Sequence, residues 1–279
     1  MLLVLSMLCA CGCGTVATQP ETTQRPTTQT EPTVPETTQP TQPEDPTEPS
    51  VPEEPTPPDD PTPPDDPVEP EHSELYIEGV TQEQMQRYFE EVVLNIEYTS
   101  SQNGILRKWT EPIIYQISGE ATGEDMTVLN NLFAQLNAVP NFPGIRPAEQ
   151  GESPNLFFRF LNRDDFKLAF SQVVNGEEVD GAVEFWFYNA TQNIYYGNIG
   201  YRTDIDQATR SSVLVEEVIN LLGISDTVLR SDSITYQYGS SVTELSAEDW
   251  VILKLLYDPQ MECGMDAEQC AEVLKNLYY

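Results

Sequence analysis

The stretch LVEEVINLLGISDTVLRSDSITYQYG, residues 214–239, joins the end of a long helix to an irregular turn. Together with the eight residues before it, it predicts one helix over residues 206–223. Gly223 follows the last helical turn, a position that favours glycine. The apolar side of the helix is formed by Val213, Leu214, Ile219, Leu221 and Leu222. Two adjacent glutamates, Glu216 and Glu217, lie on the same helix, so a core helix also carries a pair of carboxylates.

The elements predicted around this helix describe an α+β fold. Thr81 and Gln84 form a capping-box pattern at the start of a helix over residues 81–98. Further helices are expected at residues 124–137, 245–259 and from 266 to the end of the chain, and strands at 111–119, 154–162, 181–189 and 194–202. This order favours a twisted, mainly antiparallel or mixed sheet with helices on one face and a helical C-terminal part.

The composition changes sharply near residue 72. Residues 17–72 consist almost wholly of Thr, Gln, Pro, Glu and Asp, and they hold 17 of the 23 prolines. Such a segment cannot bury enough apolar surface to fold, so we predict a disordered spacer there. Residues 73–279 are enough for one domain with a core of its own.

Residues 1–16 are predicted to be a lipoprotein signal peptide. The run MLLVLSMLCACGCG, residues 1–14, is apolar but too short to span a bilayer as a helix. Within it LCAC, residues 8–11, is similar to the lipobox of bacterial lipoproteins. This resemblance implies that Cys11 carries the lipid, with Cys13 as the second choice. We therefore expect an exported, membrane-anchored lipoprotein at the bacterial cell surface or in the periplasm.

The charge of the chain excludes one class of function. Of 46 acidic and 13 basic residues, 32 and 12 fall in residues 73–279, which gives that part a net charge of −20. A surface this acidic repels nucleic acid, and no nucleic-acid-binding motif is present. The acidity provides solubility, or else an affinity for divalent cations or basic wall polymers. We expect a monomer that meets the membrane through its lipid anchor and a cell-wall or protein partner through its domain.

Two cysteines, Cys263 and Cys270, lie outside the leader. In an exported protein a pair seven residues apart can form a disulfide, and reduced, half-buried thiols are the alternative. The one histidine of the chain, His72, lies in the spacer, so the two cysteines do not make a zinc site.

The helix and turn of residues 206–239 resemble the active site of metzincins, zinc peptidases whose H-E-x-x-H helix ends at a glycine. On that pattern Glu216 and Asn220 stand at the two histidine positions. Glu217 stands at the general base, and Asp226 stands at the third ligand. DSITYQYG, which follows, resembles the methionine turn with threonine in place of methionine.

Without histidines the domain cannot build a zinc site of that kind. Oxygen donors on Glu216, Asn220 and Asp226 would suit Ca²⁺ or Mg²⁺ rather than Zn²⁺. Our first expectation is no cofactor, with such a hard cation as the alternative. We interpret Glu216 and Glu217 first as a solvated helix face with ordinary salt links. Asn220 is interpreted as a partner of neighbouring backbone rather than a metal ligand.

Five stretches carry a resemblance to a wider family: ILRKWTEPIIYQISG, SPNLFFRF, EEVINLLGISD, LSAEDWVILKLLYDP and CGMDAEQC. They fall in the order seen in the bacterial lipoprotein family catalogued as domain of unknown function 2927. The resemblance covers most of residues 75–275 and is most specific in the C-terminal third. It implies a degenerate metzincin-like domain without the zinc-ligand histidines and without an established role. Asn220 departs from the glutamine usual in the family, and the turn that follows departs as well.

Two further motifs receive structural interpretations. The sequence RKW, residues 107–109, precedes the first strand and is expected to seat the loop there through cation–π and polar contacts. VEFWFYN, residues 183–189, could pair with a peptide strand if it lies at a sheet edge. The first interpretation places its phenylalanines in the core, with Trp186 and Tyr188 under a helix or loop.

Two functions from different classes follow. The leading hypothesis is a lipid-anchored cell-surface protein whose non-catalytic, protease-like domain binds or scaffolds. The alternative is a metal-assisted hydrolase that uses Glu216 or Glu217 as base, with an oxygen-bound cation at Asn220 and Asp226. That alternative requires a water-accessible cleft beside the glutamates, and a buried helix face contradicts it. A purely structural wall protein is a third hypothesis, favoured if the domain has no cleft.

Overall fold

The computed structural model describes residues 72–94, 104–174, 178–238 and 242–278. The predicted signal peptide with Cys11, and the predicted spacer up to residue 71, lie outside these residues. In chain order the elements are α1 (Gln82–Phe89), the π-helix η1 (Glu90–Leu94), β1 (Lys108–Trp109), β2 (Ile113–Gly119), α2 (Gly123–Leu136), β3 (Ile145–Pro147), β4 (Leu156–Leu161), α3 (Arg163–Ala169), α4 (Ser171–Val174), β5 (Gly181–Phe187), β6 (Asn193–Arg202), α5 (Gln207–Leu221), α6 (Ala247–Leu256) and α7 (Ala267–Leu277). Each predicted helix and strand has a counterpart in the structure: α1 and η1 lie within the helix predicted over residues 81–98, whose last four residues lie outside the described ones. The elements β1, β3, α3 and α4 were not predicted.

The strands form one six-stranded, mostly parallel sheet within a mixed α/β fold. The main path is β1-β6-β4-β2-β3, in which all neighbours are parallel. Strand β5 pairs antiparallel with β6. The prediction of a mainly antiparallel sheet is therefore wrong. Parallel neighbours need long crossover connections. Helix α2 lies in the connection from β2 to β4, and α3, α4 and β5 lie in that from β4 to β6.

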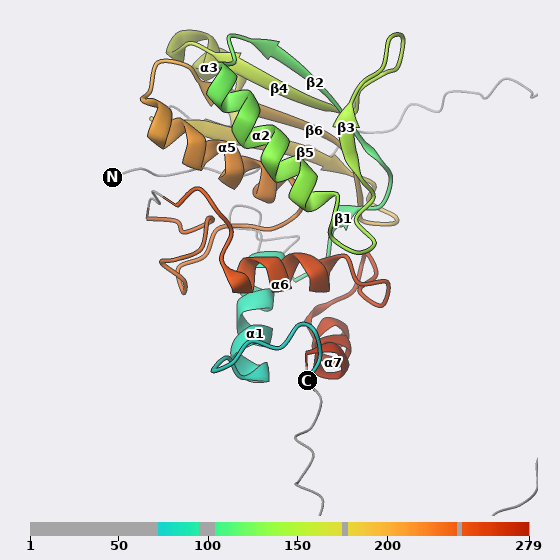
Figure 1. Ribbon diagram of the computed structural model, residues 1–279. Coiled ribbons are helices and arrows are strands. Elements are labelled where there is room, and N and C mark those ends of the chain that lie inside the picture. The colour runs from blue at the N-terminus through green and yellow to red at the C-terminus, as the bar shows by residue number, and fades with distance from the viewer. Residues whose placement is uncertain (1–71, 95–103, 175–177, 239–241, 279) are drawn as a thin grey trace, which may run out of the picture. The chain divides into compact units, whose positions relative to one another are not determined.

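Helices cover both faces of the sheet. Helices α2 and α5 pack side by side over one face (Figure 1). A Cβ added to Gly181 on β5 would lie 2.4 Å from Val213 Cγ1 on α5, so strand and helix are in close contact. The next residues along the strands face the other way. A Cβ on Gly200 of β6 would lie 2.2 Å from Phe170 Cε2, at the end of α3. The expectation that helices back only one face is wrong.

The helix starts follow the local capping chemistry of the sequence. Thr81 Oγ1 accepts a hydrogen bond from Gln84 N at 3.2 Å, and Gln84 Oε1 accepts one from Thr81 N at 2.8 Å, as predicted. Ser246 and Asp249 form the same reciprocal pair at the start of α6. These side chains satisfy backbone donors that have no partner inside the helix. The two boxes fix where α1 and α6 begin.

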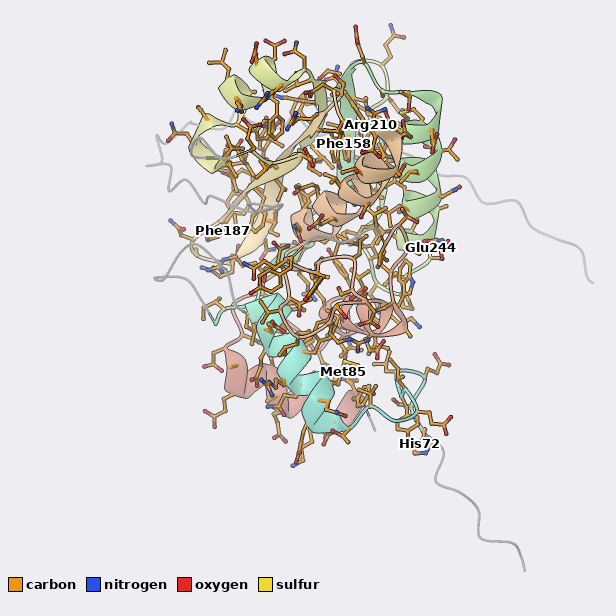
Figure 2. All side chains as sticks on the ribbon, turned by 90° about the vertical axis from the view of Figure 1, so that its left-hand side faces the viewer. His72, Met85, Phe158, Phe187, Arg210 and Glu244 are labelled. Atoms are coloured by element: carbon orange, nitrogen blue, oxygen red, sulfur yellow. The ribbon has the colours of Figure 1, made fainter. Side chains whose placement is uncertain are left out.

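One hydrophobic cluster joins the sheet to the terminal helices. Phe158 of β4 and Met85 of α1 are both 0 % exposed and both belong to it (Figure 2). A smaller cluster around Phe166 and Phe170 lies under α3 and α4. Among the described residues, no helix combines the length and apolar character needed to cross a membrane.

Candidate functional site

Helix α5 and the turn after it position the candidate residues. Asp206 caps the helix by accepting a hydrogen bond from Thr209 N, and Gly223 follows its end with a φ of 97°. A Cβ at Gly223 would lie 2.5 Å from the Arg107 carbonyl oxygen, so the turn requires glycine for both conformation and space. The chain then reverses. Asn220 Nδ2 donates to Asp226 Oδ1 at 3.3 Å, which ties the turn back to the helix.

The four predicted site residues are buried. Glu216 is 4 % exposed, Glu217 0 %, Asn220 2 % and Asp226 9 %. The interpretation of the glutamates as a solvated helix face is therefore wrong. The physical reason is that α5 is central: every residue from 210 to 221 is buried, so the helix has no solvent side. The alternation of apolar and polar residues in its sequence did not reveal this.

The buried carboxyls disfavour one another's ionised forms. Burial, followed by the negative charges of Asp226 and Glu217, holds the pKa of Glu216 well above its usual range. Burial and the charge of Asp226 do the same for the pKa of Glu217. Ionising a carboxyl group in the poorly polarisable interior of a protein costs far more free energy than ionising it in water. The structure therefore brings Glu216 and Glu217 close to Asp226, and this setting favours the neutral forms of the two glutamates.

Glu217 is the most isolated member of this group. Its side chain reaches toward strand β5, and a Cβ on Gly181 would lie 2.6 Å from Glu217 Oε1. Neither carboxyl oxygen of Glu217 has a hydrogen-bond partner among the residues that the structure describes. Burial, and secondly the nearby charge of Glu217, raises the pKa of Tyr201, whose hydroxyl donates to the Leu214 carbonyl at 3.2 Å. A carboxyl group in this setting must be neutralised, by a proton or by a cation.

A metal centre remains a prediction. In the described part of the chain, no three or more His, Cys, Asp or Glu side chains are grouped so that they could hold a metal ion. The candidate set of Glu216, Asn220 and Asp226 includes an amide, and its donors are oxygens, which suit Ca²⁺ or Mg²⁺. The observed contact within this set is the Asn220–Asp226 hydrogen bond.

The turn after the site is anchored to helix α6. Ser233 Oγ donates to Asp249 Oδ1 at 2.8 Å, and the Tyr88 hydroxyl donates to the same oxygen at 2.6 Å. Burial, together with the charge of Asp249 and this bond, raises the pKa of Tyr88. Thr235, which stands where the metzincin pattern has methionine, is 1 % exposed and accepts from Thr227 N through its carbonyl oxygen at 2.9 Å. Thus α1, the turn and α6 meet in one buried polar network.

Residues 107–109 make the structural contacts predicted for them. The Arg107 guanidinium lies 4.3 Å from the centre of the Phe187 ring. Trp109 Nε1 donates to the Leu221 carbonyl at 3.0 Å, at the end of α5. Lys108 Nζ donates to three backbone carbonyls near the end of α6 (Leu256, Asp258 and Met261). Burial lowers the pKa of this lysine. Trp109 and Lys108 thus join β1 to the C-terminal ends of α5 and α6, and Arg107 packs on β5.

The two cysteines of the domain are free thiols in the structure. Cys263 is half-buried and Cys270 is buried, and no disulfide joins them. Burial raises the pKa of Cys263, and it raises that of Cys270 to about 12. Of the two alternatives left open by the sequence, the structure has the reduced pair.

Strand β5 lies beside β6 at an edge of the described sheet, but it is not an open edge. Val183 is 0 % and Phe185 1 % exposed, so the centre of the strand is covered and pairing with a peptide strand is not favoured. Phe185 is in the core, as predicted. Tyr188 is not: it is 56 % exposed and stacks on Tyr195 with ring centres 4.3 Å apart, so the prediction that it lies under a helix or loop is wrong.

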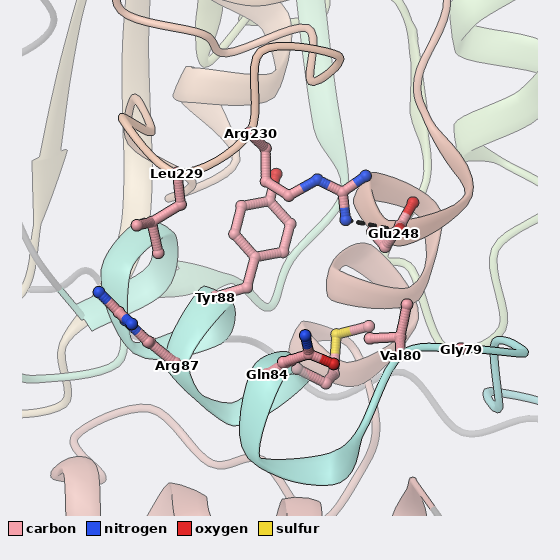
Figure 3. Close-up of a pocket in the computed structure, with 9 residues that line it drawn as sticks. Gly79, Val80, Gln84, Arg87, Tyr88, Leu229, Arg230 and Glu248 are labelled. Atoms are coloured by element: carbon pink, nitrogen blue, oxygen red, sulfur yellow. Dashed lines mark ion pairs between the residues drawn. The ribbon is translucent and has the colours of Figure 1, made fainter.

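A pocket that the sequence did not suggest lies on the side of α1 (Figure 3). Its volume is about 240 Å³. Its wall combines apolar and charged side chains from three distant segments: Val80, Met85, Arg87, Leu229, Arg230 and Glu248. No local spacing could reveal such a set. The single hint in the sequence is the Val228–Leu229 pair, two large apolar residues that remain half exposed in an irregular stretch.

The chain was compared with known protein families and with curated proteins. The model of the family described as "Protein of unknown function (DUF2927)" matches residues 82–276, which cover all the candidate residues of the domain. No curated protein matches the chain.

Proposed function

Because the chain belongs to the family of proteins of unknown function DUF2927, whose description assigns no activity, we propose a function from the site itself. The chain is a lipid-anchored cell-surface protein whose domain is a non-catalytic, protease-like module that binds or scaffolds. One observation carries this proposal. Glu216 and Glu217 stand where the metzincin pattern has its first zinc ligand and its general base, and they are 4 % and 0 % exposed.

The burial of the two glutamates favours a binding role over hydrolysis. A general base must come within hydrogen-bond distance of the proton that it takes, directly or through one water. A base on a closed helix face meets neither substrate nor bulk water. A hydrolase built on these glutamates would need a water-accessible cleft beside them, and the covered helix α5 argues against one. The pocket beside α1 in turn argues against a purely structural protein without a cleft.

Incubation of the purified full chain with a mixed peptide library, followed by mass spectrometry, tests the non-catalytic role. We expect no cleavage beyond that seen with the Glu217→Gln variant. Cleavage that disappears in this variant would contradict the proposal.

The metzincin-like origin of the domain is part of the same proposal. It is supported by the order of helix, Gly223 and returning turn, and by the contact between Asn220 and Asp226. If these are the old ligand positions, Glu216→His, Asn220→His and Asp226→His together should create a site that retains one equivalent of Zn²⁺ after dialysis. A variant with the same two helix histidines and Asp226→Ala should bind at least about tenfold more weakly. Equal binding by both variants would show that the turn does not supply a third ligand.

The lipid anchor is proposed from LCAC at residues 8–11. The full chain, expressed in a bacterial host supplied with radiolabelled palmitate, should incorporate label and sediment with membranes. Cys11→Ser should abolish both properties, whereas Cys13→Ser should leave them intact. Label that survives Cys11→Ser would contradict the assignment of the lipidated residue.

A metal-assisted hydrolase is the second candidate, and one observation favours it. Glu217 has two buried oxygens without a hydrogen-bond partner among the described residues, beside the charges of Glu216 and Asp226. A hard cation would neutralise them as well as protons do. The metal content of the purified chain, with calorimetric titration of Ca²⁺, Mg²⁺ and Zn²⁺, separates the two possibilities. One equivalent of Ca²⁺ or Mg²⁺, lost in Glu216→Gln plus Asp226→Asn, would favour this candidate, and no binding would exclude the cation.

A further inference from the structure

The pocket beside helix α1 has the chemistry of a site for a small organic anion (Figure 3). We propose that it binds a small carboxylate with an apolar body, the carboxylate on Arg87 and the body against Leu229, Val80 and Met85. The inference rests on the proposed binding role of the domain and names the ligand class for it.

The charge of the pocket comes from Arg87. Arg230, the other arginine, is already engaged: its guanidinium pairs with Asp232 at 2.6 Å and with Glu248 at 2.5 Å. These pairs also neutralise Glu248, the acid in the pocket wall. Arg87 forms no ion pair or side-chain hydrogen bond with any described residue. The pocket therefore keeps one uncompensated positive charge in a strongly acidic chain.

The acids nearest along the helix do not take up this charge. Glu83, Glu90 and Glu91 stand about one helical turn from Arg87, the spacing at which ion pairs form. Glu90 Oε1 accepts a hydrogen bond from Gln86 Nε2 at 2.8 Å. Glu91 is turned away and accepts hydrogen bonds from Thr227 Oγ1 at 2.9 Å and from Val228 N at 2.8 Å. Because Glu91 is engaged with the turn, Arg87 remains available to a ligand. A guanidinium binds a carboxylate through two parallel hydrogen bonds.

The rest of the pocket suits an apolar body of limited size. Met85 is fully buried at its base, and Leu229 is 43 % exposed at its side. The ring of Tyr88 lines the pocket, and its hydroxyl is committed to Asp249. The ring therefore offers carbon surface rather than a polar group. A volume of about 240 Å³ lies below the usual range of drug-sized sites, roughly 300–1,000 Å³. A short aromatic or branched acid fits this size.

The carboxylate could belong to a free acid or to the C-terminus of a peptide. We would titrate the full chain by calorimetry and by ligand-observed NMR with 3-phenylpropionate and with its uncharged amide. The tripeptide Ala-Ala-Phe, with a free or an amidated C-terminus, tests whether the carboxylate of a peptide C-terminus binds. Whichever of the two is the ligand, we expect its carboxylate form to bind at least about tenfold tighter than the matched amide.

The variants locate the site. Arg87→Gln should reduce carboxylate affinity at least about tenfold, the loss expected for one charge-assisted contact. Leu229→Ala should weaken both acid and amide. Arg159→Gln removes a basic residue of strand β4 that does not line the pocket, and it should change nothing. Thermal unfolding of each variant checks that the fold is retained.

Equal binding of acid and amide, or unchanged binding by Arg87→Gln, would overturn the proposal, as would no binding of any of the four probes. Such a failure would leave the non-catalytic role intact, because that role is tested by peptide cleavage. Cleavage dependent on Glu217 would contradict the non-catalytic role whether or not carboxylates bind.

Discussion

At the scale of single residues, the centre of the domain holds an unusual set of acids. Glu216 and Glu217 are buried close to Asp226, although acidic side chains are rarely fully buried. The two glutamates link the stability of the folded state to protonation, because an acid whose pKa is raised in the folded protein gives stability that is complete below its unfolded pKa. This stability is lost as the pH rises toward the folded pKa.

The substitution Glu217→Gln should make the domain less sensitive to alkaline pH. Burial and the nearby charge of Asp226 hold the pKa of Glu217 well above its usual value of 4.5, so above that pH the folded protein keeps a proton that the unfolded chain has released, until the pH reaches the folded pKa. While that holds, this one group lowers the free energy of unfolding by about 1.4 kcal/mol per pH unit. Urea unfolding at pH 6, 7 and 8 should show a slope smaller by up to about that amount in Glu217→Gln.

The exposed Glu244 provides a matched control, and Glu244→Gln should leave the pH slope as in the wild type. If Glu217→Gln also leaves the slope unchanged, the carboxyl at position 217 does not carry a proton in the folded state.

Asp125 is a buried acid whose pKa is lowered rather than raised, because it has hydrogen-bond partners. It is 0 % exposed and pairs with Arg210 Nε at 2.8 Å, and it accepts from Gln207 Nε2 at 2.7 Å. Burial raises its pKa, but the hydrogen bonds from Gln207, Thr122 and Arg210 outweigh burial and hold the pKa below its usual value of 3.8. Its stabilising effect is therefore present above that pH and is lost as the pH falls through the folded pKa.

We predict that Asp125→Ala destabilises the domain by about 3 kcal/mol, because it leaves the Arg210 guanidinium buried without its counter-ion. Denaturant unfolding at pH 7 measures this change. Glu152→Ala breaks the exposed pair with Arg146 and should destabilise the domain far less than Asp125→Ala does. Similar losses from the two variants would contradict the assigned role of the Asp125–Arg210 pair.

At the scale of elements, features encoded by neighbouring residues were predictable and those encoded by distant ones were not. The start of α1 at Thr81 and the start of α6 after Ser246 follow from capping residues three apart. The parallel order of the sheet depends on which strands pair across long connections, and half-buried strands such as β4 show the same alternation in either direction. The metzincin pattern placed Asn220 and Asp226 in one candidate site, and the structure joins them by a hydrogen bond that was not predicted. Their burial was not predictable, because the covering segments come from elsewhere in the chain.

Strand β1 has only two residues in its range, and one of them, Lys108, connects it to the end of helix α6. Lys108 Nζ donates to the carbonyls of Leu256 at 2.8 Å, Asp258 at 3.3 Å and Met261 at 2.5 Å, just past the end of α6. Lys108→Met keeps the aliphatic stem but leaves these carbonyls without their shared donor. Buried acceptors without partners cost about 1–3 kcal/mol each. We therefore expect a loss of at least about 2 kcal/mol in guanidinium unfolding.

Lys254→Met, which replaces a half-exposed lysine on α6 itself, is the control for Lys108→Met and should cost less than about 0.5 kcal/mol. Equal effects would mean that the loss of a positive charge, rather than of the carbonyl contacts, explains the change.

At the scale of the whole molecule, the chain divides by composition. The family match begins at residue 82 and ends at residue 276, within the part that the sequence predicts to fold. The composition predicts that the acidic, proline-rich residues 17–72 bury no core of their own. In a lipid-anchored protein such a segment would hold the domain away from the membrane, where its pocket could meet soluble ligands.

Limited proteolysis of the full chain tests this division. Glutamates are frequent both before residue 72 and within the domain, so a glutamate-specific protease finds its target residue in both parts. Cleavage requires a segment that can adopt an extended conformation, and the packed helices and strands of the domain resist it. We expect rapid loss of the residues before 72 and a resistant fragment that begins after Glu71, identified by intact mass. Early cuts within residues 104–174, at a rate similar to those before residue 72, would show that the domain is not an independent folded unit.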